Sequence, residues 1–176
     1  KNIASELMDE LSPASKIIGA CNVFVNKDGK LYGDVTDGAG FIKNLSVNGV
    51  EVKGKKMVVL GAGGAATAIQ VQAALDGAAE VAIFNRDDEF FERAEGTKAK
   101  LEKECPDVKV TVTKLEEADK LAEAVKACDI LVNATSVGMK PQDGISLIDT
   151  ALLREDLVVA DRSEERRVGK ECLKRC

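Results

Sequence analysis

The stretch Lys56-Met-Val-Val-Leu-Gly61-Ala-Gly63-Gly-Ala-Ala66 decides the fold of this chain. A short apolar run, typical of a buried strand, leads directly into a glycine-rich turn and then into an alanine-rich helix that reaches about Leu75. The first glycine permits the tight turn, the second lets the backbone approach a ligand, and Ala66 lets helix and strand pack closely. Free N–H groups at the start of the helix favour an anion such as a pyrophosphate. The predicted dinucleotide-binding residues of the turn are Gly61, Ala62, Gly63, Gly64 and Ala65. A glycine turn without a ligand is the alternative.

Downstream of this turn, apolar runs alternate with helical patterns. The runs cover residues 81–84, 108–112, 130–132 and 157–160, and the helical patterns cover residues 89–104 and 117–127. Buried strands separated by helices indicate a parallel sheet with helices on both faces. The sequence therefore predicts an α/β fold with a Rossmann-type doubly wound parallel sheet.

Upstream of the turn, the pattern is different. Ile3, Leu7, Met8 and Leu11 recur at helical spacing, and Ser12-Pro13 is expected to end that helix. Two short β-prone runs flank Asp28-Gly29, which predicts a hairpin with a tight turn. A further helix is expected over residues 37–45.

Composition narrows the possible functions. Hydrophobic residues make up 45% of the 176, enough for a core, and no apolar run approaches the roughly 18 residues of a membrane span. A net charge of −5 and only 3% aromatic residues argue against nucleic acid. Histidine is absent, which removes Ser-His-Asp and Cys-His catalysis, and the five cysteines form no CxxC pair. We expect a cytoplasmic protein with free thiols, no metal, no nucleic-acid partner and no membrane partner.

The end of the second predicted strand bears on cofactor choice. At this position a Rossmann domain holds the adenine ribose, where a carboxylate accepts from the 2′-hydroxyl and an arginine pairs with a 2′-phosphate. Here Asn85 and Arg86 are followed by Asp87 and Asp88. Arg86 favours NADP, whereas the two aspartates favour NAD. The alternative is that the aspartates only cap the next helix. The prediction is a site that tolerates NAD and leaves NADP open.

The fourth predicted strand leads into Asn133-Ala-Thr-Ser-Val-Gly-Met139 at the carboxyl edge of the sheet. Ligands bind at this edge in open α/β sheets, and small residues there leave room for a nicotinamide ring. Met139 could pack against that ring. The candidate residues are Thr135, Ser136, Val137 and Met139. A plain strand-to-loop exit is the alternative.

The last residues differ in character from the rest. Residues 162–176 hold six basic and three acidic side chains, a net of +3, which leaves −8 for residues 1–161. The run Arg162–Cys172 resembles the translation of a common sequencing-library adapter. We therefore expect residues 162–176 to be a non-native tail and the sheet to lack one strand. An ordinary charged terminal helix is the alternative.

Several motifs in one order resemble the shikimate dehydrogenase family. They are Gly19-Ala-Cys-Asn22, Gly33-Asp-Val-Thr-Asp37-Gly38, the turn at 61–65, Asn85-Arg86 and Asn133–Met139. The stretches at 84–92 and 137–141 are closest to the quinate/shikimate dehydrogenase branch. The resemblance covers residues 1–161. One departure is Val35, where the family usually has asparagine.

This resemblance implies a catalytic pair. The family's lysine lies just ahead of a helix that ends like Asp9-Glu-Leu-Ser-Pro13, which places it at Lys1, and its catalytic aspartate matches Asp37. Asn22 and Thr36 are then expected beside the substrate's ring hydroxyls, and Asp88 beside the adenine ribose. Lysine with aspartate would supply the acid/base chemistry of a chain without histidine, because the carboxylate fixes the ammonium group and tunes its pKa. An exposed, frayed terminus is the alternative for Lys1.

The resemblance also implies a domain plan and an activity. Residues 1–36 would be the remnant of a smaller α/β substrate-binding domain, and residues 37–161 a C-terminally truncated NAD(P)-binding Rossmann domain. The parent, a monomer or homodimer, would reversibly reduce 3-dehydroshikimate to shikimate, or 3-dehydroquinate to quinate, with NAD and/or NADP as cofactor in aromatic amino-acid biosynthesis. We expect this fragment itself to be inactive.

Two rivals remain. One is a related enzyme domain, such as that of methylenetetrahydrofolate dehydrogenase or glutamyl-tRNA reductase, and the other is a non-catalytic dinucleotide-binding module. Neither rival needs Asn22 and Asp37.

Overall fold

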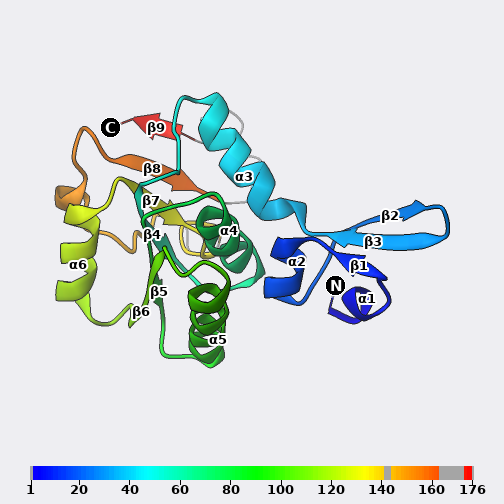
Figure 1. The fold of residues 1–176 in the computed structure, drawn as a ribbon. Helices are drawn as coiled ribbons and strands as arrows, with labels where there is room; N and C mark the ends of the chain where they lie inside the picture. The colour runs from blue at the N-terminus through cyan, green and yellow to red at the C-terminus, as the bar shows by residue number, and fades with distance from the viewer. Residues whose placement is uncertain (1, 141–143, 163–172, 176) are drawn as a thin grey trace.

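The computed structural model describes residues 2–140, 144–162 and 173–175. They form a three-stranded sheet near the N-terminus and a larger six-stranded sheet, as Figure 1 shows. Within the described residues, no helix is long and apolar enough to cross a membrane, and no group of three His, Cys, Asp or Glu side chains could hold a metal ion.

The small sheet contains the predicted hairpin. Its strands are β1 (Glu10–Leu11), β2 (Val23–Lys27) and β3 (Lys30–Asp34), in the order β1-β3-β2. Strands β2 and β3 pair antiparallel around Asp28 and Gly29, which have φ angles of 53° and 84°. Positive φ at both central residues is what a two-residue hairpin turn requires. The hairpin prediction is confirmed.

The single helix expected over residues 3–11 is wrong. Helix α1 (Asn2–Glu6) ends early, because Glu10 and Leu11 instead pair in parallel with β3. Ser12 then caps a new helix, α2 (Pro13–Ile18), whose first residue is the proline that was expected to end one. Proline is favoured at the first helical position, since its missing N–H would be unbonded there anyway. Strand pairing over sequence distance thus overrides the local helical pattern.

The large sheet confirms the predicted fold class. Its order is β6-β5-β4-β7-β8-β9, and the pairs from β6 to β8 are all parallel. The strands are β4 (Lys56–Leu60), β5 (Glu80–Asn85), β6 (Lys109–Lys114), β7 (Ile130–Asn133), β8 (Val158–Asp161) and β9 (Leu173–Arg175). The chain leaves β4 toward one edge through β5 and β6 and then returns to β7 on the other side. The switch point where ligands bind in such sheets is therefore between β4 and β7.

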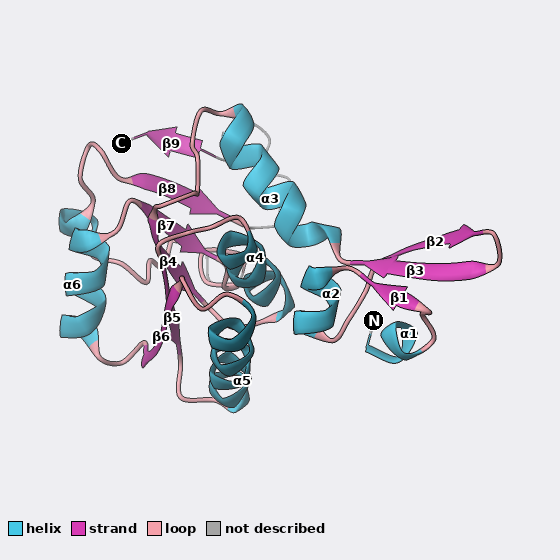
Figure 2. Ribbon diagram, in the orientation of Figure 1, coloured by secondary structure: helices cyan, strands magenta, loops and turns pink. Residues whose placement is uncertain are grey.

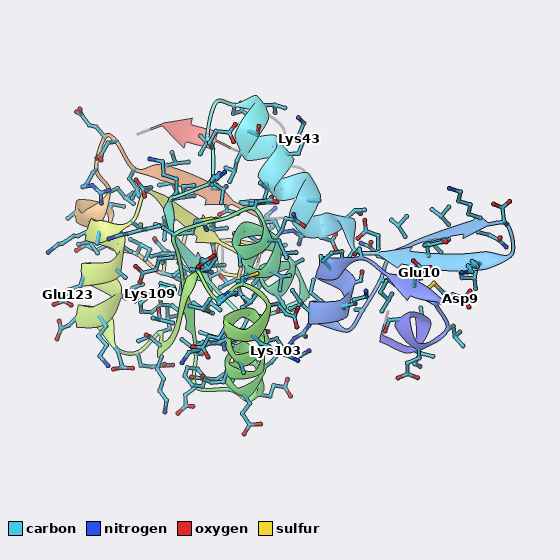
Figure 3. All side chains as sticks on the ribbon, in the orientation of Figure 1. Asp9, Glu10, Lys43, Lys103, Lys109 and Glu123 are labelled. Atoms are coloured by element: carbon cyan, nitrogen blue, oxygen red, sulfur yellow. The ribbon has the colours of Figure 1, made fainter. Side chains whose placement is uncertain are left out.

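Helices cover both faces of this sheet (Figure 2). Helices α3 (Thr36–Val47), α4 (Gly64–Leu75) and α5 (Glu89–Glu104) pack with one face of the strands in a core that includes Leu45, Ile69 and Leu101. Helix α6 (Ala118–Ala127) and the short helix η1 (Thr150–Leu152) cover the other face. Exposed charged residues such as Lys103 on α5 and Glu123 on α6 lie on the outside of these layers (Figure 3).

Helix α3 connects the two sheets. It begins directly after β3 and crosses α4 so closely that a Cβ built on Gly38 would lie 2.2 Å from the carbonyl oxygen of Ala68. Helix α2 also packs on α4 and α5, where the ammonium group of Lys100 donates to the carbonyl of Ile17 at 2.7 Å. The small sheet is therefore attached beside the helix that follows the glycine turn.

The sheet edge after β8 differs from the expectation of a missing strand. Strand β9, which comes from the tail, pairs antiparallel with β8 and aligns Arg175 with Val158. An open sheet edge offers unpaired N–H and C=O groups that any extended segment can use, so this pairing needs no particular sequence. Residues 163–172 of the tail lie outside the described residues.

Candidate active site

The glycine turn between β4 and α4 has the geometry of an anion cradle. Gly61 has a φ angle of 104°, which side chains rarely adopt. A Cβ built on it would lie 3.0 Å from Cγ2 of Thr135, so the loop after β7 packs closely against the turn. Gly63 precedes α4 and makes no side-chain cap. The first N–H groups of α4 are thus left for a ligand.

A cavity of about 270 Å³ opens beside this turn. It lies at the carboxyl ends of β4, β5 and β7, and a dinucleotide binds at this edge of a doubly wound sheet. The predicted cofactor residues that line it are Gly61, Ala62, Gly63, Asn85, Arg86, Asp88, Thr135, Ser136 and Val137. The predicted residues Gly64, Ala65 and Met139 do not line it.

The cavity also has apolar walls that the sequence analysis did not predict. They include Phe90, in the first turn of α5, and Leu115, which directly follows β6. An aromatic ring beside an aliphatic side chain suits a stacked base. Because β6 neighbours β5 in the sheet, its carboxyl end comes beside the predicted ribose edge, and that strand order is the signal that could have identified Leu115.

The predicted ribose edge consists of residues 85–88, and its two aspartates have different surroundings. The carboxylate of Asp88 caps α5 by accepting from the N–H of Phe90 at 3.0 Å, and it also accepts from the side chain of Asn85 at 2.8 Å. Asp88 therefore caps the helix and lines the cavity as well. Arg86 lies 3.5 Å from the other oxygen of the same carboxylate.

Asp87 pairs instead with a lysine that sequence reasoning missed. Its Oδ2 lies 2.7 Å from the ammonium group of Lys114, at the end of β6. The hydrogen bond and the negative charge of Asp87 raise the pKa of Lys114. Asp88 thus lies beside Arg86, and Asp87 lies beside Lys114.

Asn133 shapes the loop after β7. Its side-chain oxygen accepts from the hydroxyl of Thr135 at 2.7 Å, and its side-chain nitrogen donates to the carbonyl of Val137 at 3.1 Å. The same nitrogen donates to Asp161 at the end of β8, also at 3.1 Å. These bonds fold Thr135 and Val137 back toward the glycine turn. The loop that is expected to hold the nicotinamide is therefore fixed from within the sheet.

The predicted substrate residues come together at the start of α3. The amide nitrogen of the Asn22 side chain donates to Asp37 at 3.1 Å, and the oxygen of that side chain accepts from the backbone N–H of Thr36 at 3.1 Å. Arg162, the first residue of the predicted non-native tail, lies 3.8 Å from Asp37 and donates its backbone N–H to the carbonyl of Asn133. The cluster is thus joined to the loop after β7. Lys1, the other half of the predicted catalytic pair, lies outside the described residues.

Comparison with protein families agrees with this geometry. Residues 44–141 match the family model described as shikimate / quinate 5-dehydrogenase. This chain belongs to the shikimate/quinate dehydrogenase family. The resemblance read from the spaced motifs is confirmed.

Individual relatives add detail. The quinate/shikimate dehydrogenase of Escherichia coli O139:H28 (strain E24377A / ETEC) is 48% identical over 162 residues, which are 92% of this chain and 56% of that protein. The shikimate 5-dehydrogenase of Listeria monocytogenes, solved in complex with shikimate and NAD, is 44% identical with a TM-score of 0.88, over 92% of this chain and 56% of its own. A shikimate dehydrogenase solved in complex with NADP+ is 32% identical with a TM-score of 0.72, over 92% and 54% of the two chains. The chain thus spans little more than half the length of these relatives.

Proposed function

We propose that the full-length protein is an NAD(P)-dependent oxidoreductase that reversibly reduces 3-dehydroshikimate to shikimate, or 3-dehydroquinate to quinate. The observation that carries this proposal is the packing of α3 on α4, because α3 begins at the cluster of Asp37 and Asn22 and α4 begins at the glycine turn that lines the cavity. A module that only binds a dinucleotide does not need the cluster of Asn22, Thr36 and Asp37 at the start of α3.

The cofactor half of the site lies in the described residues. In our proposal the pyrophosphate rests on Gly61, Ala62, Gly63 and the start of α4, because their N–H groups favour anions. The adenine lies between Phe90 and Leu115, and its ribose faces Asp88 and Arg86. The nicotinamide lies against residues 135–139. Two of the relatives described above were solved with NAD or NADP+ bound, which supports this assignment.

The substrate half rests on fewer residues of this chain. The nicotinamide accepts or supplies the hydride at the ring carbon that bears the hydroxyl. In our proposal Asn22 and Thr36 orient ring hydroxyls, and Lys1 exchanges a proton with the reacting oxygen. Asp37 fixes the ammonium group of Lys1 and favours its charged form. Asp37 stands in the first turn of α3, where the helix dipole stabilises a carboxylate.

Steady-state kinetics on the full-length parent tests the activity, with shikimate and quinate each assayed against NAD+ and NADP+. We expect turnover with at least one pairing. Asp37→Asn should lower kcat by about 100-fold or more, since it removes the charge that positions the lysine, and an exposed control such as Asp119→Asn on α6 should leave kcat unchanged.

For the 176-residue chain itself we propose weak cofactor binding and no turnover, because it spans only 56% of the length of its Escherichia coli relative. A chemical-shift titration with NAD+ tests the binding, and the coupled formation of NADH tests the activity. Measurable turnover by the isolated chain would contradict this part, and a parent that oxidises neither substrate would contradict the whole proposal.

A further inference from the structure

The back of the glycine turn is tied to the helix that follows it. The side-chain amide of Gln70 donates to the carbonyl of Gly61 at 2.8 Å. The hydroxyl of Thr67 donates to the carbonyl of Gly63 at 3.0 Å and lies 3.4 Å from that of Ala62. Both side chains come from α4 and are buried, with 0% of Gln70 and 3% of Thr67 exposed. Successive carbonyls of the turn therefore all face α4.

This arrangement decides which groups of the turn face a ligand. In a trans peptide unit the N–H points opposite to the C=O. When the carbonyls of Gly61, Ala62 and Gly63 are held toward α4, the N–H groups of the next residues are directed away from these two side chains. Glycine permits either orientation of such peptides. A flipped peptide would present a carbonyl oxygen to the ligand, and that oxygen would repel a phosphate.

Gln70 keeps this contact at a cost. Its Oε1 is buried and has no hydrogen-bond partner among the described residues, a state that disfavours folding. A methionine or leucine of similar size would bury no such atom. The orientation of the amide is also fixed, because turning it over would put two oxygens against each other at Gly61. Gln70 thus buries an unbonded oxygen, which disfavours folding, and makes one specific polar contact. This combination indicates that the contact with Gly61 has a role.

We propose that Thr67 and Gln70 are positioning residues that preset the turn for the pyrophosphate of the cofactor. This inference rests on the cofactor half of the proposed function. Neither side chain lines the cavity, so both act through the backbone of residues 61–63.

Near-isosteric variants test the inference in the 176-residue chain. Gln70→Met and Thr67→Val remove the hydrogen bonds with little change in volume, and Thr67→Ser retains the hydroxyl. Gln72→Met on the same helix is the matched control, since within the described residues the Gln72 side chain bonds to Asp76 at the end of α4 and not to the turn. Dissociation constants for adenosine and for ADP are read from chemical-shift titrations, because adenosine lacks the phosphates that the turn would hold.

We expect Gln70→Met and Thr67→Val each to weaken ADP binding about fivefold, the effect of one lost hydrogen bond, and to leave adenosine binding unchanged. Thr67→Ser and Gln72→Met should bind both ligands as the unaltered chain does. If Gln70→Met does not fold, the Thr67→Val and Thr67→Ser pair carries the same comparison.

Unchanged ADP affinity in the variants, or an equal loss for adenosine and ADP, would overturn the inference while leaving the proposed function intact. An unaltered chain that binds adenosine and ADP equally would overturn the pyrophosphate site itself, and the inference with it.

Discussion

At the scale of single residues, the ribose edge shows how neighbouring charges change the meaning of a motif. In the sequence, Asp87 and Asp88 argue against the 2′-phosphate of NADP. In the structure, Asp88 shares its carboxylate with the cap of α5 and with Arg86, and Asp87 faces Lys114. Two acids paired with two bases repel a phosphate less than two free acids do. We therefore expect the edge to accept both cofactors.

Lys114→Gln tests this view of the edge. The change uncovers the charge of Asp87, so 2′,5′-ADP should bind severalfold more weakly, whereas 5′-ADP should bind as before. The effect should shrink at high salt, because the pair is exposed. Lys109→Gln is the control, since Lys109, labelled in Figure 3, begins β6 at the end opposite to Lys114 and pairs with Glu80 of β5. An equal loss for both nucleotides in chemical-shift titrations would contradict the prediction.

A second residue-scale prediction concerns Cys128, whose thiol is buried at the end of α6. Burial raises its pKa from 9.0 to about 11. The unfolded thiol then loses its proton at lower pH than the folded one, so the stabilising difference is present below pH 9 and is lost as pH rises toward 11. Urea midpoints measured from pH 8 to 11 should therefore fall more steeply for the unaltered chain than for Cys128→Ala. Parallel curves would contradict the assignment.

At the scale of elements, hydrophobic patterning predicted the large sheet well. Each apolar run from 57 to 160 became a strand, and the helix expected over 89–104 is α5 with the same bounds. Buried parallel strands have little besides apolar residues, so the pattern is unambiguous. The prediction for residues 3–11 failed, because Glu10 and Leu11 pair with Tyr32 and Gly33, 22 residues further along the chain. Lys114 was missed for the same reason, since its pairing with Asp87 depends on β6 lying beside β5 rather than on neighbours in sequence.

The crossing of α3 and α4 gives a prediction for an element. A Cβ at Gly38 would lie 2.2 Å from the carbonyl oxygen of Ala68, whereas nothing lies within 4 Å of a Cβ at Gly40 in the same helix. Gly38→Ala should force the helices apart and lower the free energy of unfolding by about 1–3 kcal/mol. Gly40→Ala should raise it by up to about 1 kcal/mol, because alanine is the better helix former. Urea denaturation of both variants measures the difference. Equal values would mean that the crossing does not depend on Gly38.

At the scale of the whole molecule, the two sheets differ in how deeply their strand residues are buried. The large sheet is covered on both faces, and strands β4 and β5 are almost wholly buried. The hairpin strand β2 is exposed along its length, including 51% of Phe24 and 54% of Val25. The relatives of this chain are longer than the matched region, which covers 56% of the Escherichia coli protein. An exposed apolar surface of this kind is typical of a face that packs against another segment or another protein.

This asymmetry predicts a gradient of amide hydrogen exchange in the isolated chain. Backbone protection follows the free energy of local opening, which is small where few apolar contacts are buried. Amides of residues 23–34 should exchange at least about tenfold faster than those of residues 57–60 and 81–85.

Adding ADP should slow exchange at the start of α4 and leave the hairpin unchanged, because the proposed phosphate site is confined to the large sheet. Hydrogen exchange followed by mass spectrometry or NMR measures both. Equal protection in β2 and β4 would mean that the small sheet is stable without further chain, and slowing in the hairpin would mean that the cofactor couples the two sheets.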